Sequence, residues 1–140
     1  MKMTNTAVIT NNNISTLLIK YSKQLCKDVV LSTGWNMFGI PVNAADMTSA
    51  TLFPAATSPV FGYTGNYTIT TDLTPGKGYW VQYPRPITVN VCGALVTPQT
   101  VPLLAGWNML SVYEKGIPVA VLSTTPAGIC LLYTSPSPRD

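Results

Sequence analysis

The apolar residues in the middle of the chain follow the two-residue period of β-strands. Ile87, Val89 and Val91 alternate with polar residues, which predicts a strand with one exposed face. Residues 29–42 carry apolar side chains on both phases of the alternation, which predicts a strand covered on both faces. Residues 78–83 alternate two tyrosines and a valine with Trp80 and a glutamine, and they predict an aromatic strand.

Turn-forming residues separate these apolar runs. Residues 60–63 and 67–71 flank Thr64-Gly65-Asn66, and a Gly-Asn pair between two such runs predicts a β-hairpin. Pro75-Gly76 predicts a type II turn, because proline presets the first central residue and glycine supplies the positive φ of the second. Strands joined by short turns favour antiparallel pairing.

Two segments carry helical signals. Asp46 can cap a short helix that runs through Phe53 and is limited by Pro54. Residues 14–25 place apolar side chains on one helical face, and these are Ile14, Leu17, Leu18, Tyr21 and Leu25. Three alternatives stay open for residues 1–28: a genuine short helix, the end of a preceding domain, or a leader translated from too early a start. The chain as a whole predicts a mainly β fold, an antiparallel sandwich- or barrel-like unit with one or two short helices.

An internal repeat organises the rest of the chain. Gly34-Trp35-Asn36-Met37 recurs 72 positions later as Gly106-Trp107-Asn108-Met109. The same ungapped offset pairs further apolar residues and prolines, among them Val29 with Val101, Leu31 with Leu103 and Pro54 with Pro126. The sequence therefore predicts a first repeat over residues 29–100 and a truncated second repeat over residues 101–129.

We expect the two repeated segments to be equivalent strands. Trp35 and Trp107 stand within apolar runs, so both are predicted to be buried in a core. Asn36 and Asn108 beside them are predicted to be buried amides that tie down the adjacent backbone.

Residues 130–140 are of a different kind. They match the translation of a transposase sequencing adapter codon for codon, so we expect them to be an artefact and the native chain to be cut near Ile129. A natural linker rich in proline and serine is the alternative.

Charge is scarce and unevenly distributed. Charged residues make up 9% of the chain and hydrophobic residues 46%, so the chain folds rather than staying disordered. The net charge of +3 arises within residues 1–28, and residues 29–129 sum to zero. A nucleic-acid partner needs a concentrated basic face, which excludes that class. No apolar run reaches the roughly 20 residues of a membrane span.

The chain offers little for catalysis or metal binding. It has no histidine, and Cys26, Cys92 and Cys130 show no paired spacing, so we expect neither a metal site nor a cofactor. Helix capping explains Asp46 and turn formation explains Asp72. No histidine can activate Cys92, so we expect it to be an inert small hydrophobe next to Gly93. We expect no catalytic residue and no enzyme activity.

Aromatic side chains are the remaining candidates for a binding site. Stacking on the face of a sugar ring calls for exposed aromatic rings on a rigid scaffold, and the candidates are Trp80, Tyr83, Tyr79, Tyr63 and Tyr67. Coplanar exposed rings would favour a carbohydrate-binding module, whereas buried rings would favour a structural spacer.

The ordered motifs resemble a known repeat. Residues 34–42 (GWNMFGIPV), 52–54 (LFP) and 75–81 (PGKGYWV) are similar to a "GWNLxSLPV…LFP…PGKGYWV" repeat of secreted Bacteroidota-type proteins. Met37 and Met109 depart from its usual leucine, and Gly39 departs from its serine. That repeat often precedes a type IX secretion sorting domain. The resemblance implies an extracellular or cell-surface location and a non-catalytic structural or adhesive role. It also implies neighbouring repeats, a polysaccharide or a surface matrix as partners.

Overall fold

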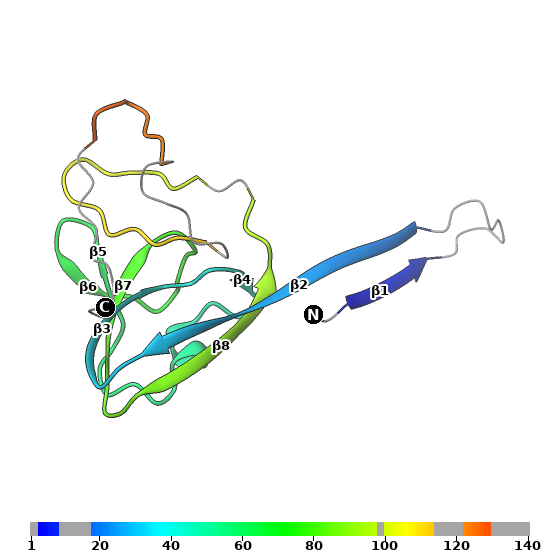
Figure 1. Ribbon diagram of the computed structural model, residues 1–140, viewed down its shortest axis with the longest axis horizontal. Helices are drawn as coiled ribbons and strands as arrows, with labels where there is room; N and C mark the ends of the chain where they lie inside the picture. The colour runs from blue at the N-terminus through cyan, green and yellow to red at the C-terminus, as the bar shows by residue number, and fades with distance from the viewer. Residues whose placement is uncertain (1–2, 9–17, 98–99, 114–121, 130–140) are drawn as a thin grey trace, which may run out of the picture.

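The computed structural model describes residues 3–8, 18–97, 100–113 and 122–129, with side chains from residue 24 onward. Residues 9–17 and the adapter-like residues 130–140 lie outside the described residues, so the predictions that concern them stay predictions. Figure 1 shows the arrangement of the elements.

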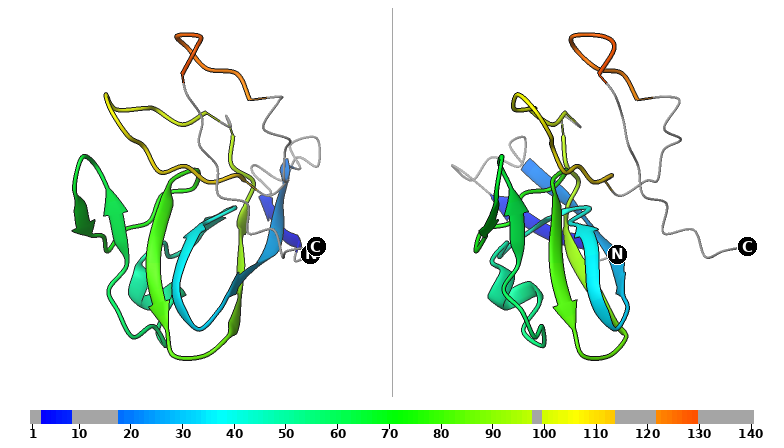
Figure 2. Two further views of the ribbon diagram at one scale, coloured as in Figure 1. Left: turned by 60° about the vertical axis from the view of Figure 1, so that its left-hand side comes forward. Right: turned by 90° about the vertical axis from the view of Figure 1, so that its left-hand side faces the viewer.

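The described residues form two antiparallel sheets, with strand orders β1-β2-β8-β4 and β3-β7-β5-β6. The two sheets lie as facing layers (Figure 2). This confirms the predicted mainly β, sandwich-like fold. The elements are β1 (Met3–Val8), β2 (Leu18–Leu31), β3 (Gly34–Gly39), β4 (Asn43–Ala44), α1 (Ser49–Leu52), β5 (Phe61–Tyr63), β6 (Tyr67–Ile69), β7 (Gly78–Tyr83) and β8 (Ile87–Ala94).

Strand β2 replaces the helix predicted over residues 14–25 in its described part. It starts at Leu18 and runs through the predicted boundary after residue 28 without a break. From Gln24 to Leu31 it pairs with β8, while its outer part pairs with β1 in a ribbon that projects from the body (Figure 1). Leu25, Val29 and Leu31 face the core two or four residues apart, so the segment also fits a strand period. The apolar pattern is therefore compatible with a helix and with a strand, and the pairing with β8 makes the segment a strand.

The run 29–42 is two strands that belong to different sheets, not one strand covered on both faces. β2 ends at Leu31 and β3 begins at Gly34, which has a φ of +91°. Before this turn the odd-numbered positions face the core, and after it the even-numbered positions do, with Phe38, Ile40 and Val42 all buried. The apolar residues occur at odd and at even positions because the turn between β2 and β3 changes which positions face the core.

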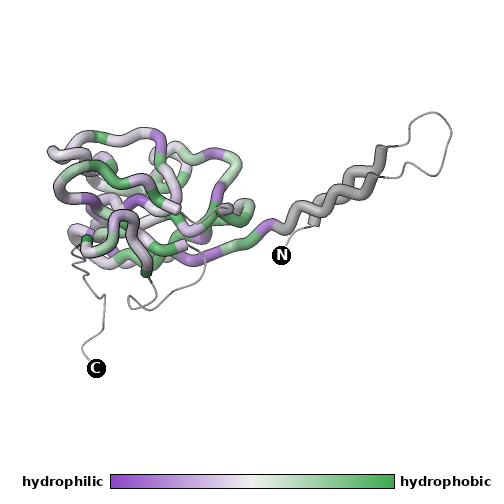
Figure 3. The backbone as a smooth tube through the Cα atoms, turned by 90° about the horizontal axis from the view of Figure 1, so that it is seen from above, coloured by the Kyte–Doolittle hydropathy of each residue, from purple (hydrophilic) through white to green (hydrophobic). Residues whose placement is uncertain are grey.

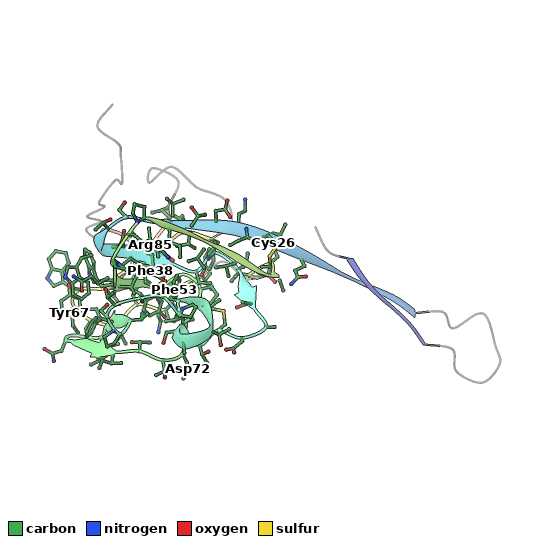
Figure 4. The ribbon with its side chains drawn as sticks, turned by 90° about the horizontal axis from the view of Figure 1, so that it is seen from below. Cys26, Phe38, Phe53, Tyr67, Asp72 and Arg85 are labelled. Carbon is green, nitrogen blue, oxygen red and sulfur yellow. A yellow bond between two sulfur atoms is a disulfide. The ribbon has the colours of Figure 1, made fainter. Side chains whose placement is uncertain are left out.

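The core lies between the two sheets and draws on both. Its buried side chains are Val29, Leu31, Phe38, Ile40, Val42, Phe53, Val60, Leu73, Tyr79, Val81, Tyr83 and Val91. Phe38 packs against Phe53 with ring centroids 4.6 Å apart, and both lie in the interior in Figure 4. Along the body, short hydrophobic and hydrophilic stretches alternate (Figure 3), as expected where strands bury one face.

The predicted turns are confirmed, and the helix begins later than expected. Gly76 has a φ of +87°, and the Lys77 N–H donates to the Thr74 carbonyl at 3.4 Å, closing the turn at Pro75-Gly76. α1 starts at Ser49 and not after Asp46, whose carboxylate instead accepts from the Thr48 N–H at 2.9 Å and from the Thr51 hydroxyl at 2.8 Å. These bonds to its charged form, the Thr48 N–H first, lower the pKa of Asp46.

Candidate functional site: an exposed aromatic groove

The sheet β3-β7-β5-β6 presents an apolar face to solvent. Directly opposed residues of antiparallel strands point to the same side of a sheet. The register places one row across all four strands, Met37–Trp80–Phe61–Ile69, and flanks it with the pairs Trp35–Gln82 and Tyr63–Tyr67. We call these eight residues the outer aromatic face. None of them carries an acidic or basic side chain.

Four rings of this face line an open groove of about 450 Å³, and they are Trp35, Phe61, Tyr67 and Trp80. Each comes from a different strand of the sheet. Trp35 is 54% exposed and Tyr67 is 60% exposed, and Tyr67 lies at the edge of the body in Figure 4. The volume lies within the roughly 300–1,000 Å³ that is typical of small-molecule sites.

The rings of the groove are tilted and do not form a flat platform. Trp35 and Phe61 have centroids 6.0 Å apart and planes inclined by 53°. Beside them, Tyr63 meets Tyr67 edge-on at 5.1 Å, with planes inclined by 63°. Each of these tilted pairs has a geometry that aromatic rings favour, so the contact stabilises the positions of the rings that it joins.

The aromatic residues selected from the sequence divide between this face and the core. Trp80 and Tyr67 line the groove, and Tyr63 stands beside it. Tyr79 and Tyr83 are only 3% and 2% exposed, so the prediction that they stack on a ligand is wrong. They point inward because they share the alternation phase of Val81, which is fully buried.

The prediction of two equivalent strands with buried tryptophans is also wrong. Trp35 is exposed and Trp107 is 66% exposed, and residues 106–109 do not form a strand. The apolar run around Trp35 predicts a core position for its side chain. Its alternation phase is opposite to that of Phe38 and Ile40, so Trp35 faces solvent because those two residues face the core.

What the repeated motif builds is a turn clamped by an asparagine. The Asn36 side chain accepts from the Ser32 N–H at 2.8 Å and donates to the carbonyls of Ser32 and Gly34 at 2.8 and 2.9 Å. Gly34 takes a positive φ that other residues rarely adopt. Gly34 permits the turn and Asn36 holds it by hydrogen bonds to the backbone, as predicted for Asn36. The Asn36 side chain is half-buried, so the prediction that it is buried is wrong.

The second motif builds the same clamp. Asn108 accepts from the Leu104 N–H at 2.9 Å and donates to the carbonyls of Leu104 and Gly106 at 2.8 and 3.0 Å. Gly106 has a φ of +89°, against +91° for Gly34. Each residue of this second clamp lies 72 positions after the matching residue of the first clamp. The two segments therefore share a turn geometry and not a strand.

A disulfide joins Cys26 to Cys92, so the prediction that Cys92 is an inert small hydrophobe is wrong. The two residues are directly opposed in the β2–β8 pair, with Cα atoms 4.0 Å apart. The sequence signal was weak, because 66 positions separate the cysteines and only the strand register brings them together.

A second groove, of about 320 Å³, lies between α1 and β8 and has the Tyr83 side chain among its walls. Burial raises the pKa of Tyr83, and its hydroxyl has no hydrogen-bond partner among the described residues.

The described part of the chain holds no cluster of three or more histidine, cysteine or acidic residues that could bind a metal ion. Nor does it contain a helix long and apolar enough to cross a membrane.

Comparison with known proteins adds no relative. No protein-family profile matches the chain, and no curated protein or solved structure matches it significantly. The features of the chain that bear on function are therefore the groove, the disulfide and the sequence motifs.

Proposed function

We propose that the chain is a non-catalytic adhesive module of a secreted or cell-surface protein, and that the aromatic groove binds an uncharged polysaccharide. The observation that carries the proposal is the groove lined by Trp35, Phe61, Tyr67 and Trp80. Large exposed apolar patches mark interaction sites, because their exposure to water costs free energy that a ligand can recover. Burying a tryptophan and a tyrosine contributes much of the affinity of such sites.

The outer aromatic face favours a neutral ligand that carries both apolar surfaces and hydroxyl groups. Sugar rings present C–H faces that pack on aromatic rings and hydroxyls that need hydrogen-bond partners. The Tyr63 and Tyr67 hydroxyls and the Gln82 amide lie on the same face as the groove and can supply those partners. An anionic polysaccharide would call for lysine or arginine, and the outer aromatic face has neither.

The tilt of the rings favours a single soluble glycan chain over a crystalline surface. A flat crystal face is matched by coplanar rings, whereas rings inclined by 53° can contact successive sugars of one twisted chain. The disulfide fits the extracellular setting, because disulfides persist mainly in oxidising compartments. The resemblance to repeats of secreted proteins supports the same location.

Trp35→Ala is expected to weaken glycan binding at least tenfold, or about 1.4 kcal/mol, since it removes one wall of the groove. The matched control is Trp107→Ala, which deletes the same exposed residue type in the same motif away from the groove. Calorimetric titration with soluble xylan, mixed-linkage glucan and mannan measures the affinities, and sedimentation with microcrystalline cellulose tests the flat surface.

Two outcomes would contradict the proposal. One is that no neutral glycan binds at millimolar concentration while Trp35→Ala turns a self-associated protein into a monomer, which would make the face a protein interface. The other is that Trp107→Ala weakens binding as much as Trp35→Ala does, which would mean that the groove is not the binding site.

A further inference from the structure

The segment 100–113 lies against the turn that precedes β7. The Gly78 N–H donates to the Met109 carbonyl at 2.9 Å, and the Ser111 N–H donates to the Gly76 carbonyl at 2.9 Å. An antiparallel bridge between Lys77 and Leu110 lies between these bonds. The segment thus adds a short antiparallel rung to the start of β7, although it forms no strand of its own.

Glycines make room for this contact. A Cβ atom at Gly39 would overlap Cβ and Oγ of Ser111, and one at Gly78 would lie 3.1 Å from Cβ of Met109. Neither glycine has a positive φ, so backbone conformation does not explain them. Gly76 needs its positive φ, and its open side is filled by the Tyr113 hydroxyl and by Val101. We call Gly39, Gly76 and Gly78 the glycine seat.

The segment on the seat is the second copy of the motif. Residues 109–111 correspond, at the offset of 72, to residues 37–39 of β3, and the preceding turn has the same asparagine clamp. Both copies of this stretch pair with the start of β7. Gly39 opposes Gly78 in the β3–β7 ladder, and Met109 bonds to the same Gly78. Ser111 therefore rests on Gly39, the residue at its own position in the first copy.

We propose that the glycine seat is a joint between consecutive repeats, at which one unit receives the residues that follow the Gly-Trp-Asn motif of the next unit in the chain. Addition of an extended segment to a strand is a common mode of recognition, because backbone hydrogen bonds need little sequence identity. In repeat proteins each unit contacts its neighbours through such local interfaces. The joint is independent of the polysaccharide proposal, because the glycine seat and the groove share no residue.

The first test adds a methyl group to the seat and then makes room for it. Gly39→Ala is expected to lower the hydrogen-exchange protection of the Gly78 and Ser111 amides by roughly tenfold or more. The amides of the β3–β7 ladder beyond Gly39 are expected to keep their protection. Ser111→Gly removes the two atoms closest to the new Cβ and leaves only the Lys77 carbonyl oxygen, at 3.2 Å, so Gly39→Ala with Ser111→Gly is expected to regain most of the protection.

The second test asks whether the seat accepts the first copy's own sequence. Leu110→Phe, Ser111→Gly and Val112→Ile together convert residues 106–112 into the sequence of residues 34–40. If the seat receives this motif as a repeat, the Gly78 amide stays protected within a few-fold of the unmodified chain.

Three outcomes would overturn the joint. In the first, Gly39→Ala leaves the Gly78 and Ser111 amides as protected as before. In the second, the double variant fails to regain protection. In the third, the triple variant loses it. Exchange measured by NMR on the full chain separates all three, because each amide is read individually. A fourth outcome, equal loss of protection throughout β3 and β7, would assign Gly39 to the ladder alone and would also reject the proposal.

Discussion

Removal of the Cys26–Cys92 disulfide is expected to lower the free energy of unfolding by about 4 kcal/mol, given 66 positions between the cysteines. The bond restricts the unfolded chain, and the loss of this restriction grows with the length of the closed loop. In the folded state it joins β2 to β8, whose pairing contributes Val29, Leu31 and Val91 to the core. A loss of this size is a large part of the stability of an ordinary small domain.

Urea titration of the oxidised protein and of the variant Cys26→Ser with Cys92→Ser measures the effect. The matched control is Cys130→Ser, which removes the third thiol outside the described residues and is expected to change stability by less than about 0.5 kcal/mol. If the double variant loses less than about 1 kcal/mol of unfolding free energy, the disulfide does not stabilise the fold by restricting the unfolded chain.

Phe38→Ala is expected to cost about 3–5 kcal/mol, the range for truncation of a buried aromatic residue. Phe38 is buried between Phe53 and Tyr79, with ring centroids 4.6 and 5.9 Å away. Trp35→Ala removes a larger ring from the same strand, yet it is expected to cost less than about 1 kcal/mol because that ring faces solvent. The smaller deletion is thus expected to be the more damaging one.

Equilibrium unfolding in urea compares the two variants. Because Phe38→Ala could prevent folding, Phe38→Leu serves as the milder change and is expected to cost less than about 1.5 kcal/mol. Equal losses for Phe38→Ala and Trp35→Ala would contradict the assignment of the two faces of β3.

The elements that could be predicted from the sequence are those whose signals are local. The strand at residues 78–83 and the turn at Pro75-Gly76 are set by alternation and by backbone preferences, so both are confirmed. The alternation at Ile87, Val89 and Val91 also identifies a strand with one exposed face. The choice of fold class followed from several such local signals that agree.

What the sequence could not supply is the set of long-range pairings. Alternation shows that Trp35 and Phe38 point in opposite directions, but it does not show which of the two meets the other sheet. That choice depends on the turn after Leu31, which shifts the phase and moves the chain from one sheet to the other. The partner of Cys26 depends in the same way on the register of β2 against β8.

The candidate site was predicted in part for the same reason. Trp80 and Tyr67 were selected because they are aromatic, and so were Tyr79 and Tyr83, which the core takes up. Trp35 and Phe61 were missed because the groove assembles from four strands that are joined by register and not by sequence distance.

The position of the disulfide also determines how the module would transmit a mechanical load. The bond joins the strand by which the chain enters the sandwich to the strand by which it leaves, so tension applied from outside passes from Cys26 directly to Cys92. The 66 positions between them hold roughly 220 Å of contour length, at ~3.4 Å per extended residue, and this length stays slack under tension. The groove lies within the shielded loop, so a ligand can stay bound while the chain is pulled. Single-molecule stretching curves with and without reductant should differ by that length, and equal curves would mean that the load takes another path.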